Sequence, residues 1–290
     1  MKVFITGGTG YIGQATITAL RAHGHDVVAL ARSQSAAQQL ELLGAEAVAG
    51  DLADTDTLRN AAEHAEAAIH LAQDYSTSAA TADLGAATAI QLGLGSRPYV
   101  HTGGAWVYGN TVGVVDETAP QSPPPITSWR PDNERRVLAR AGDGGHPVLV
   151  MPGVVYGHGG GLITAFLANP ARTGAAHYIG AGDNYWTVVH VDDLAELYVA
   201  ALSAPAGATY IGVDDTQSPT MRQIAEAVSV GANRPGTAAS VPLDQARQEF
   251  GPFADAFALS QRLTAARARH ELNWTPQHHD ALSEFATAAT

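Results

Sequence analysis

The chain has 290 residues, of which 46% are hydrophobic and 15% are charged, and its formal net charge is −12. This length allows one large domain or two closely joined domains, and the acidic balance argues against nucleic acid or an anionic membrane as a partner. The sequence has no cysteine, no apolar run near the length that spans a bilayer and no recognisable secretion signal, so we expect a cytoplasmic protein without disulfides.

Short β-rich runs alternate with helix-like stretches through the first half of the chain. The predicted strands are Lys2–Thr6, Asp26–Ala31, Ala45–Ala49, Ala67–Leu71, Tyr99–Thr102 and Val148–Met151. The predicted helices between them are Ile12–Ala22, Ala36–Leu43, Thr55–Glu63, Ala79–Leu94 and Trp129–Arg140. This alternation indicates βαβ units, and hence a parallel sheet that helices cover on both faces.

One stretch, Gly109–Ser128, interrupts the alternation. It is rich in proline and includes the run Pro123–Pro125, which predicts a long loop. Long loops without structure of their own are usually functional or disordered. Because this one lies between a strand end and a helix, we expect it to form a wall of the active site.

The pattern loosens after Pro152, where a glycine-rich loop, Gly157–Gly161, follows. The further predicted elements are strands at His177–Ile179 and Trp186–His190 and helices at Asp192–Leu202, Thr220–Val228, Leu243–Phe250 and Ser260–His270. We therefore predict an α/β fold with a doubly wound parallel (Rossmann) sheet in residues 1–155. A smaller, interleaved α/β cap would occupy residues 156–290, with residues 186–213 partly returning to the sheet.

The turn between the first strand and the first helix has the sequence GGTGYIG. Glycines at this spacing permit a tight turn, close approach of the backbone to a pyrophosphate and close helix packing, while the helix N-terminus faces the phosphates. We therefore predict a dinucleotide site. The residues of the turn expected to contact the cofactor are Gly7, Thr9, Gly10, Tyr11, Ile12 and Gly13.

The tip of the second strand carries Arg32 and Ser33, and no carboxylate occurs between Asp26 and Glu41. An NAD site usually places an acidic residue here to hold the ribose 2′-hydroxyl, whereas an arginine accommodates a 2′-phosphate. The sequence therefore favours NADP over NAD, with Arg32 and Ser33 at the phosphate. The alternative is that Arg32 is a solvated surface charge.

Further landmarks follow the glycine turn in order along the chain. They are Gly50-Asp51-Leu52, His70-Leu71-Ala72, Trp106-Val107-Tyr108-Gly109, Met151-Pro152-Gly153-Val154-Val155-Tyr156-Gly157 and Val189-His190-Val191-Asp192-Asp193-Leu194-Ala195. Over essentially the whole chain, this ordered set resembles the extended short-chain dehydrogenase/reductase superfamily, which includes sugar-nucleotide epimerases, dehydratases and dihydroflavonol reductases. The cofactor contacts that the resemblance implies are Asp51 and Leu52 at the adenine, Leu71 and Ala72 at the ribose, and Pro152 and Val155 near the nicotinamide.

The sequence departs from this superfamily at its catalytic residues, which are a serine or threonine, a tyrosine and a lysine. Counting from the Val-Tyr-Gly turn places Gly104 at the serine, Trp129 at the tyrosine and Asn133 at the lysine. The only lysine of the chain is Lys2 in the first strand, so no Tyr-x-x-x-Lys motif exists in this sequence. Thr102 remains as a hydroxyl near the serine position, within reach of the cofactor.

A reductase of this kind needs another proton source, or a substrate that needs none. The candidate acids are Tyr108, Tyr156 and His158, together with Thr102. Tyr108 follows the fifth strand at the carboxyl edge, where open α/β sheets place their sites. The alternatives are that Tyr108 is a structural residue of its turn and that His158 is simply solvated.

The expected substrate pocket lies at the same edge of the sheet. Its candidate lining residues are Asp74, Tyr75, Gly104, Trp106, Tyr108, Trp129 and Tyr156. The two indoles would form an apolar wall, unless they belong to the core. Next to Trp129, we expect Arg130 to pair with Glu134, four residues later, rather than to bind a substrate carboxylate.

Three further histidines are not expected to take part in catalysis or metal binding, and His190 is expected to be structural. His190 precedes two aspartates in a context that resembles a packing and capping motif. His278 and His279 lack the partners and spacing of a metal site, so we predict no metal.

The sequence thus predicts an NADP(H)-dependent reductase of a small, largely apolar carbonyl, imine or activated alkene. The alternative is a non-catalytic NADP-binding protein that reports redox state to a partner. An epimerase or lyase is disfavoured, because oxidising a sugar hydroxyl needs a base. The helices Ala79–Leu94 and Trp129–Arg140 match those that pair across a dimer in the superfamily, which would allow a homodimer.

Overall fold

The computed structural model describes residues 1–73, 76–166 and 175–287. Its main feature is a seven-stranded parallel sheet with the strand order β11-β7-β5-β4-β1-β2-β3. The strands are β1 (Lys2–Thr6), β2 (Asp26–Ala31), β3 (Glu46–Ala49), β4 (Ala67–His70), β5 (Pro98–Thr102), β7 (His146–Pro152) and β11 (Thr209–Gly212). The doubly wound α/β fold predicted from the sequence is confirmed.

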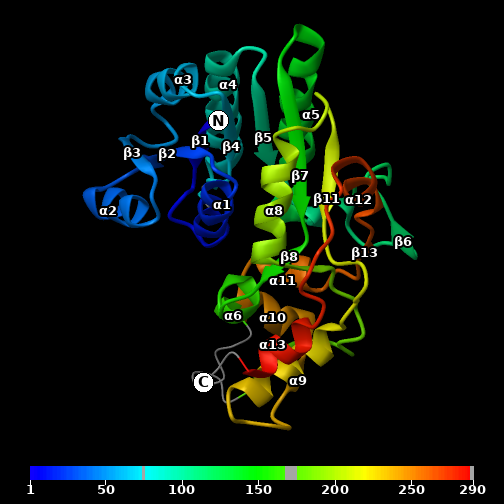
Figure 1. Cartoon of the computed structure of the whole chain (residues 1–290). Coiled ribbons are helices and arrows are strands. Elements are labelled where there is room, and N and C mark those ends of the chain that lie inside the picture. Colours follow the sequence, from blue (N-terminus) through cyan, green and yellow to red (C-terminus); the bar gives the residue numbers. More distant parts are fainter. Residues whose placement is uncertain (74–75, 167–174, 288–290) are drawn as a thin grey trace.

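Each face of the sheet carries a hydrophobic layer, because neighbouring residues of a strand point to opposite sides. In β1, Val3 and Ile5 pack in one cluster with α1 and α8, whereas Phe4 packs in another with α3 and α4 (Figure 1). The helices on the first side are α1 (Tyr11–Ala22), α2 (Gln34–Leu42) and α8 (Val191–Ala201). Those on the second are α3 (Thr55–Glu63), α4 (Ala79–Leu94) and α5 (Arg130–Ala139).

A second, smaller lobe lies beyond the carboxyl ends of the strands, where β7 leads directly into β8 (Figure 1). Its strand pairs are β8 (Val154–Tyr156) with β10 (Val188–His190), and β9 (His177–Ile179) with β12 (Ala239–Val241). Its helices are α6 (Gly161–Phe166), α9 (Met221–Gly231), α10 (Leu243–Phe250), α11 (Phe253–Phe257) and α13 (Ala281–Thr287). These elements share a separate hydrophobic core.

The predicted helix Ser260–His270 is wrong in its first half. Arg262–Leu263 form the strand β13 instead, which pairs with β6 (Val114–Val115), and the helix α12 begins only at Ala266. The physical reason lies in Gln261, whose buried side-chain amide donates to two backbone carbonyls of the segment after β5. These contacts hold the chain extended, and helical periodicity does not reveal them.

The proline-rich stretch Gly109–Ser128 is consequently not a loop without structure. It supplies β6 to the pair with β13 and ends in the short 3-10 helix η2 (Pro125–Thr127), shortly before α5. Another short 3-10 helix, η1 (Ala105–Tyr108), precedes it. The remaining predicted elements have bounds within a few residues of those in the structure.

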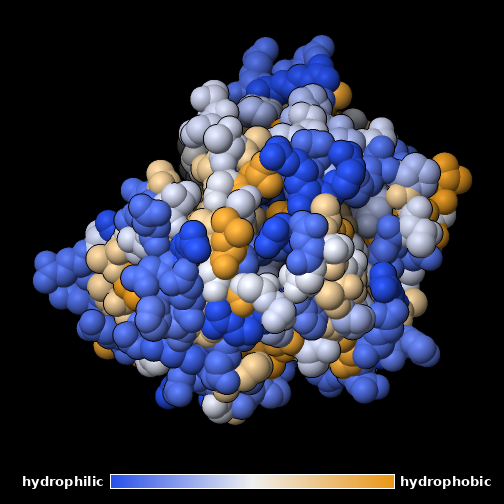
Figure 2. Space-filling model, turned by 90° about the horizontal axis from the view of Figure 1, so that it is seen from above, coloured by the Kyte–Doolittle hydropathy of each residue, from blue (hydrophilic) through white to orange (hydrophobic). Residues whose placement is uncertain are grey.

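The surface seen from above is mostly hydrophilic, with small separate apolar patches (Figure 2). Exposed large apolar side chains such as Leu42, Val112 and Val230 lie on different elements of the chain. Within the described residues, no helix is both long and apolar enough to cross a membrane.

Two glycines of α4 provide a matched test of how closely this helix packs. A Cβ at Gly93 would lie 2.3 Å from the carbonyl oxygen of Arg59 in α3, whereas a Cβ at Gly85 would have no atom within 4 Å. We expect Gly93→Ala to lower the free energy of unfolding by about 1–3 kcal/mol through overpacking. Gly85→Ala should raise it by about 0.5–1 kcal/mol through helix propensity. Urea unfolding measures both, and equal effects would contradict this packing.

Candidate functional site

The glycine turn between β1 and α1 is sterically closed to side chains. Gly7 has a φ of +75°, and a Cβ at Gly13 would lie 2.1 Å from the carbonyl oxygen of Gly7. The first helical residue is Tyr11, and its N-cap, Gly10, makes no side-chain capping bond. The first N–H groups of α1 are therefore not capped by a side chain, as an anion-binding helix start requires.

The end of β4 lies against this turn. A Cβ at Gly7 would lie 2.6 Å from the backbone nitrogen of Ala72, which donates to Thr6 Oγ1 at 3.4 Å. Leu71 also lies within 3 Å of that Cβ position. The structure thus brings together the turn and the Leu71–Ala72 segment that the resemblance assigns to the ribose.

Tyr11 connects the turn to the second lobe, a role that its sequence position did not indicate. Its hydroxyl donates to the carbonyl oxygen of Gly157 at 2.8 Å, and a Cβ at Gly160 would lie 2.4 Å from its ring. Burial raises the pKa of Tyr11 well above its usual value. Only a glycine-rich loop can lie this close to the ring.

The predicted NADP-selecting residues lie at the exposed tip of β2. Ser33 caps α2 by accepting from the backbone nitrogen of Ala36 at 3.2 Å. Arg32 is exposed, and no ion pair involves it within the described ranges. Asp51 is exposed, and its Oδ1 accepts from the backbone of Ala53 at 2.8 Å; the adjacent Leu52 is half-buried.

The remaining predicted cofactor residues lie where β7 enters the second lobe. Pro152 ends β7 as the register partner of Gly212 in β11. Val155 lies in β8, paired with Val189 of β10, and a Cβ at Gly161 would lie 2.4 Å from its carbonyl oxygen. The Gly157–Gly161 loop therefore folds back over the strand that carries Val155.

Gly104, which the register of the sequence places at the family's serine, has open space around it. Gly104 is half-buried, and a Cβ added there would meet no atom closer than Arg130 Nε at 4.0 Å. The nearby Thr102 Oγ1 lies 2.9 Å from the hydroxyl of Tyr198 in α8. Burial raises the pKa of Tyr198 well above its usual value.

Arg130 is the charged residue that borders this open position. Its side chain is buried, with Nη1 donating to the carbonyl oxygen of Thr102 at 3.2 Å and Nη2 to Gln73 Oε1 at 2.8 Å. The guanidinium also stacks on Trp129, 4.7 Å from the ring centre. The predicted pair with Glu134 is therefore wrong: the cation binds acceptors at the strand ends instead.

Glu134 is left without a partner by this arrangement. Both carboxyl oxygens are buried, and neither has a hydrogen-bond partner in the described structure. A Cβ at Gly103 would lie 2.7 Å from its Oε1. The carboxyl group therefore packs against the backbone that follows β5. Burial raises the pKa of Glu134 to about 7.

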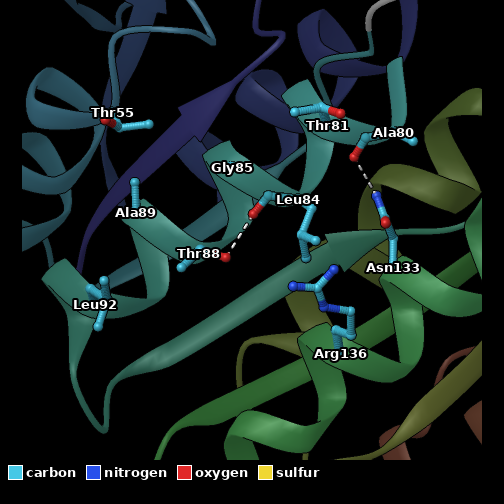
Figure 3. A pocket seen from close by; sticks show the side chains of 10 residues that line it. All are labelled: Thr55, Ala80, Thr81, Leu84, Gly85, Thr88, Ala89, Leu92, Asn133 and Arg136. Atoms are coloured by element: carbon cyan, nitrogen blue, oxygen red, sulfur yellow. Dashed lines mark hydrogen bonds between the residues drawn. The ribbon is translucent and has the colours of Figure 1, made fainter. Parts of the chain in front are cut away.

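Asn133, at the lysine position, joins α5 to α4. Its Nδ2 donates to the carbonyl oxygen of Ala80 and to Asp83 Oδ2, each at 2.8 Å. It also lines an open hollow of about 680 Å³ between these helices, where its amide points toward Ala80 (Figure 3). No residue of the glycine turn lines this hollow, so it is not the cofactor cleft.

The predicted acids Tyr108, Tyr156 and His158 are already bonded elsewhere. The Tyr108 hydroxyl donates to the sulfur of Met151 at 3.3 Å, and burial raises its pKa. The Tyr156 hydroxyl donates to the carbonyl oxygen of His278 at 3.1 Å. His158 Nε2 lies 2.8 Å from Asp192 Oδ2, at the surface of the second lobe.

Of the other predicted pocket residues, Trp106 packs edge-on against Phe253 and Phe257, with ring centres 6.2 and 6.0 Å apart. This contact belongs to the hydrophobic core of the second lobe. Asp74 and Tyr75 lie outside the described residues.

The expectation of a capping role for His190 is confirmed, because its Nδ1 accepts from the first-turn nitrogen of Asp192 at 3.2 Å. His278 and His279, which were not expected to form a metal site, each contact an aspartate. His278 Nδ1 lies 3.1 Å from an oxygen of Asp193, and its ring stacks on His190 at 3.8 Å. His279 is likewise paired with a buried aspartate. Tertiary contacts across distant segments supply these partners.

Comparison with known proteins agrees with the glycine turn and the sheet. The model of the NAD dependent epimerase/dehydratase family matches residues 3–211. An uncharacterized protein of Schizosaccharomyces pombe is 29% identical over 298 residues, which covers 100% of this chain and 99% of that protein. A 4-hydroxy-2-methyl-3-oxo-4-farnesyl-3,4-dihydroquinoline-1-oxide ketoreductase of Stigmatella aurantiaca is 29% identical over 228 residues, covering 74% of this chain and 68% of the relative.

Among solved structures, the complex of dTDP-glucose 4,6-dehydratase from Bacillus anthracis with NAD superposes with a TM-score of 0.82 at 16% identity. The match covers 99% of this chain and 96% of that one. At this level of identity the likeness shows the fold alone.

Because the Glu134 carboxyl is buried without a hydrogen-bond partner in the described structure, we expect the free energy of unfolding to depend on pH. Burial raises the pKa of this carboxyl from its usual 4.5 to about 7 in the folded state. Between these values the folded chain binds a proton that the unfolded chain has lost, so the free energy of unfolding falls as the pH rises from 4.5 to 7. Glu134→Gln removes the titration. We expect this variant to match the wild type near pH 5 and to exceed its free energy of unfolding by a few kcal/mol near pH 8.5.

Urea unfolding at both pH values measures the difference. Glu63→Gln, an exposed change in α3, is the control and should not alter the pH profile. Parallel profiles for the wild type and Glu134→Gln would contradict the elevated pKa.

Proposed function

We propose a function from one premise: the chain belongs to the NAD dependent epimerase/dehydratase family. The proposed function is NADP(H)-dependent reduction of a small, largely apolar carbonyl, imine or activated alkene. Family membership supports binding of a nicotinamide dinucleotide, and the ketoreductase relative supports oxidoreductase chemistry in general. The residues that would hold the cofactor fit it, because the glycine turn leaves the first N–H groups of α1 without a side-chain cap, as a phosphate-binding helix start requires.

The observation that carries the proposal is the buried guanidinium of Arg130 beside Gly104. An arginine stays protonated in proteins, so it supplies a fixed positive charge but no proton. It lies across the ends of β4 and β5 through Gln73 and Thr102. In this role Arg130 stabilises negative charge that develops on a substrate oxygen, which is a large term in many enzymes.

The bound dinucleotide supplies the hydride in such a reduction. For a carbonyl substrate, the carbon gains the hydride, the π electrons move to the oxygen, and Arg130 stabilises the resulting alkoxide. The Thr102 hydroxyl, which Tyr198 holds at 2.9 Å, then gives its proton to the alkoxide and regains one from water when the product leaves. An iminium substrate needs no such proton, which suits a site where the family's tyrosine is replaced by Trp129.

The apolar character of the proposed substrate rests on the aromatic side chains near this edge. Trp129 is half-buried and held in place by the stacked Arg130. An indole offers a flat apolar surface and cannot serve as an acid of useful pKa. A polar sugar nucleotide gains less from such a wall than a small apolar substrate does.

A non-catalytic NADP sensor is the second candidate. It is favoured by Asn133, whose amide at the lysine position is bonded into the seam between α4 and α5 rather than free to hold a ribose. Such a protein binds the cofactor without turnover. Steady-state assay therefore separates the two functions.

The preference for NADP over NAD is tested at Arg32. Loss of a charge-assisted contact to the 2′-phosphate costs about 1.5–3 kcal/mol, so Arg32→Ala should weaken NADPH binding about 10- to 100-fold. NADH affinity should not change. Fluorescence titration measures both, with the exposed Arg59→Ala of α3 as the control. Equal loss for both cofactors would assign Arg32 a different role.

The catalytic proposal is tested at Arg130. NADPH oxidation is measured against a panel of aldehydes, ketones, imines and enones. For carbonyl substrates, Arg130→Met should lower kcat about 100- to 1000-fold, as removal of an oxyanion-stabilising donor does. Arg136→Met, three positions beyond Asn133 on the exposed face of α5, should leave kcat unchanged. Cofactor binding with no turnover across the panel would favour the sensor instead.

A further inference from the structure

A buried cluster of two histidines and one aspartate joins β4, β5 and α4. His70 and His101 are register partners on neighbouring strands, and Asp83 faces them from α4. The two histidine side chains are 1% and 0% exposed, and that of Asp83 is 10% exposed. Each histidine Nε2 lies 3.6 Å from the same atom, Asp83 Oδ1. Three potential ligand atoms therefore converge inside the protein.

The two Nε2 atoms lie within ion-pairing distance of Asp83 but make no hydrogen bond in the described part of the chain. Neither has a hydrogen-bond partner within residues 1–73, 76–166 and 175–287, and 3.6 Å is too long for an N–H···O bond. Buried polar atoms almost always have partners, since leaving one without costs about 1–3 kcal/mol. Both nitrogens face the same carboxylate oxygen, Asp83 Oδ1. This arrangement indicates that a ligand binds between the two nitrogens and that oxygen.

The opposite ring nitrogens already have oxygen partners. His70 Nδ1 lies 2.6 Å from Thr6 Oγ1, and His101 Nδ1 lies 2.8 Å from the Tyr99 hydroxyl. When each Nδ1–H donates to its oxygen, each Nε2 presents a lone pair to the interior. Metal-binding histidines almost always have such a second partner, which fixes the tautomer and the ring orientation.

The carboxylate is oriented in the same way. Asp83 Oδ2 accepts from Asn133 Nδ2 at 2.8 Å, which leaves Oδ1 turned toward the two imidazoles. The residue at the family's lysine position thus acts here as a positioning residue for Asp83. This contact gives Asn133 a role that its place in the family does not predict.

We propose that His70, Asp83 and His101 bind a divalent transition-metal ion of the zinc class. Metal–ligand bonds of about 2.0–2.1 Å in a tetrahedral site place neighbouring ligand atoms about 3.4 Å apart, close to the 3.6 Å seen from each Nε2 to Oδ1. Imidazole nitrogens with one carboxylate form a donor set that Zn²⁺ commonly takes.

A second histidine cluster differs from this one, because ring nitrogens of both its histidines already have partners within the protein. His158, His190 and Asp192 also bring three potential ligand atoms together. There, His158 Nε2 already lies 2.8 Å from Asp192 Oδ2, and His190 Nδ1 accepts from the Asp192 backbone. His190 Nε2 lies 3.4 Å from Glu284 Oε2, and the His158 side chain is largely exposed.

The proposed ion has a route from solvent. Ala80 and Asn133 line the open hollow between α4 and α5 (Figure 3), and the Asn133 amide contacts both Ala80 and Asp83. Displacement of this one side chain opens the cluster to the hollow. A water molecule that enters by the same route would complete a four-coordinate site.

The role of such an ion is structural. It links two central strands to α4, and the Thr6 side chain that supports His70 ends β1 directly before the glycine turn. The site needs no contact with the cofactor or the substrate. The proposal therefore does not depend on the proposed reductase function.

The direct test is metal binding by the full chain. Protein treated with EDTA and dialysed is titrated with Zn²⁺ in competition with a chromophoric chelator. We expect one tight equivalent per wild-type chain. Asp83→Asn and His101→Gln should each lower the affinity at least 100-fold, and Asn133→Ala should lower it about 10- to 100-fold, as loss of a supporting residue does.

Controls separate this cluster from the surface one. His158→Ala should keep the tight equivalent, and Zn²⁺ should raise the Tm of the wild type and of His158→Ala but not that of Asp83→Asn. The proposal is overturned if the wild type takes up no tight equivalent. It is also overturned if that equivalent survives Asp83→Asn or disappears in His158→Ala.

A measurement on the wild type alone covers the case in which the buried variants do not fold. In protein loaded with Co²⁺, ligation through both Nε2 atoms should give two exchangeable, hyperfine-shifted imidazole N–H resonances in the proton NMR spectrum. These are the Nδ1 protons held by Thr6 and Tyr99. Absence of this pair of signals at saturating Co²⁺ rules out the proposed ligation.

Discussion

The arrangement of both lobes depends on the steric constraint at the turn between β1 and α1. The backbone passes so close to itself and to β4 that side chains are excluded at Gly7 and Gly13. That constraint fixes where α1 begins, leaves its first N–H groups for an anion, and holds the ends of β4 and β1 together. The Tyr11 hydroxyl then joins the same turn to the loop at Gly157 in the second lobe. One close backbone approach thus determines the cofactor cradle and the attachment of the smaller lobe.

Much of the sheet could be predicted because its signals are local. Apolar runs such as Val27–Leu30 and the glycines of the first turn act over a few residues, and these elements form as expected. The pairing of β13 with β6 could not be predicted, since it brings together segments about 150 residues apart through the side chain of Gln261. Partners for His278 and His279 were missed for the same reason. Contacts of this kind have no periodicity that a sequence reveals.

The helix α5 shows how tertiary contacts replace a local rule. The spacing of Arg130 and Glu134 favours an ion pair along the helix, yet the guanidinium finds a carbonyl and an amide at the strand ends instead. A buried arginine gains more from several fixed acceptors than from one flexible carboxylate, because it cannot lose its charge. The carboxyl group of Glu134 can lose its charge, and burial without a partner drives it toward the neutral form. Burial removes both side chains from water. Arg130 keeps its charge and binds fixed acceptors, whereas Glu134 shifts toward its neutral form.

The charged Arg130 and the neutral form of Glu134 restrict the chemistry available at the neighbouring edge of the sheet. A permanent cation beside the open position at Gly104 favours reactions that develop negative charge there. Where the resemblance places the family's tyrosine and lysine, this sequence has the indole of Trp129 and the amide of Asn133, neither of which readily gives up a proton. The hydroxyls of Thr102 and Tyr198 remain as the only directly coupled pair described next to the guanidinium, and burial makes Tyr198 a weak acid. We therefore propose that activated carbonyls and alkenes, whose reduction gives weakly basic oxyanions that the guanidinium can stabilise, suit this site better than unactivated ketones do.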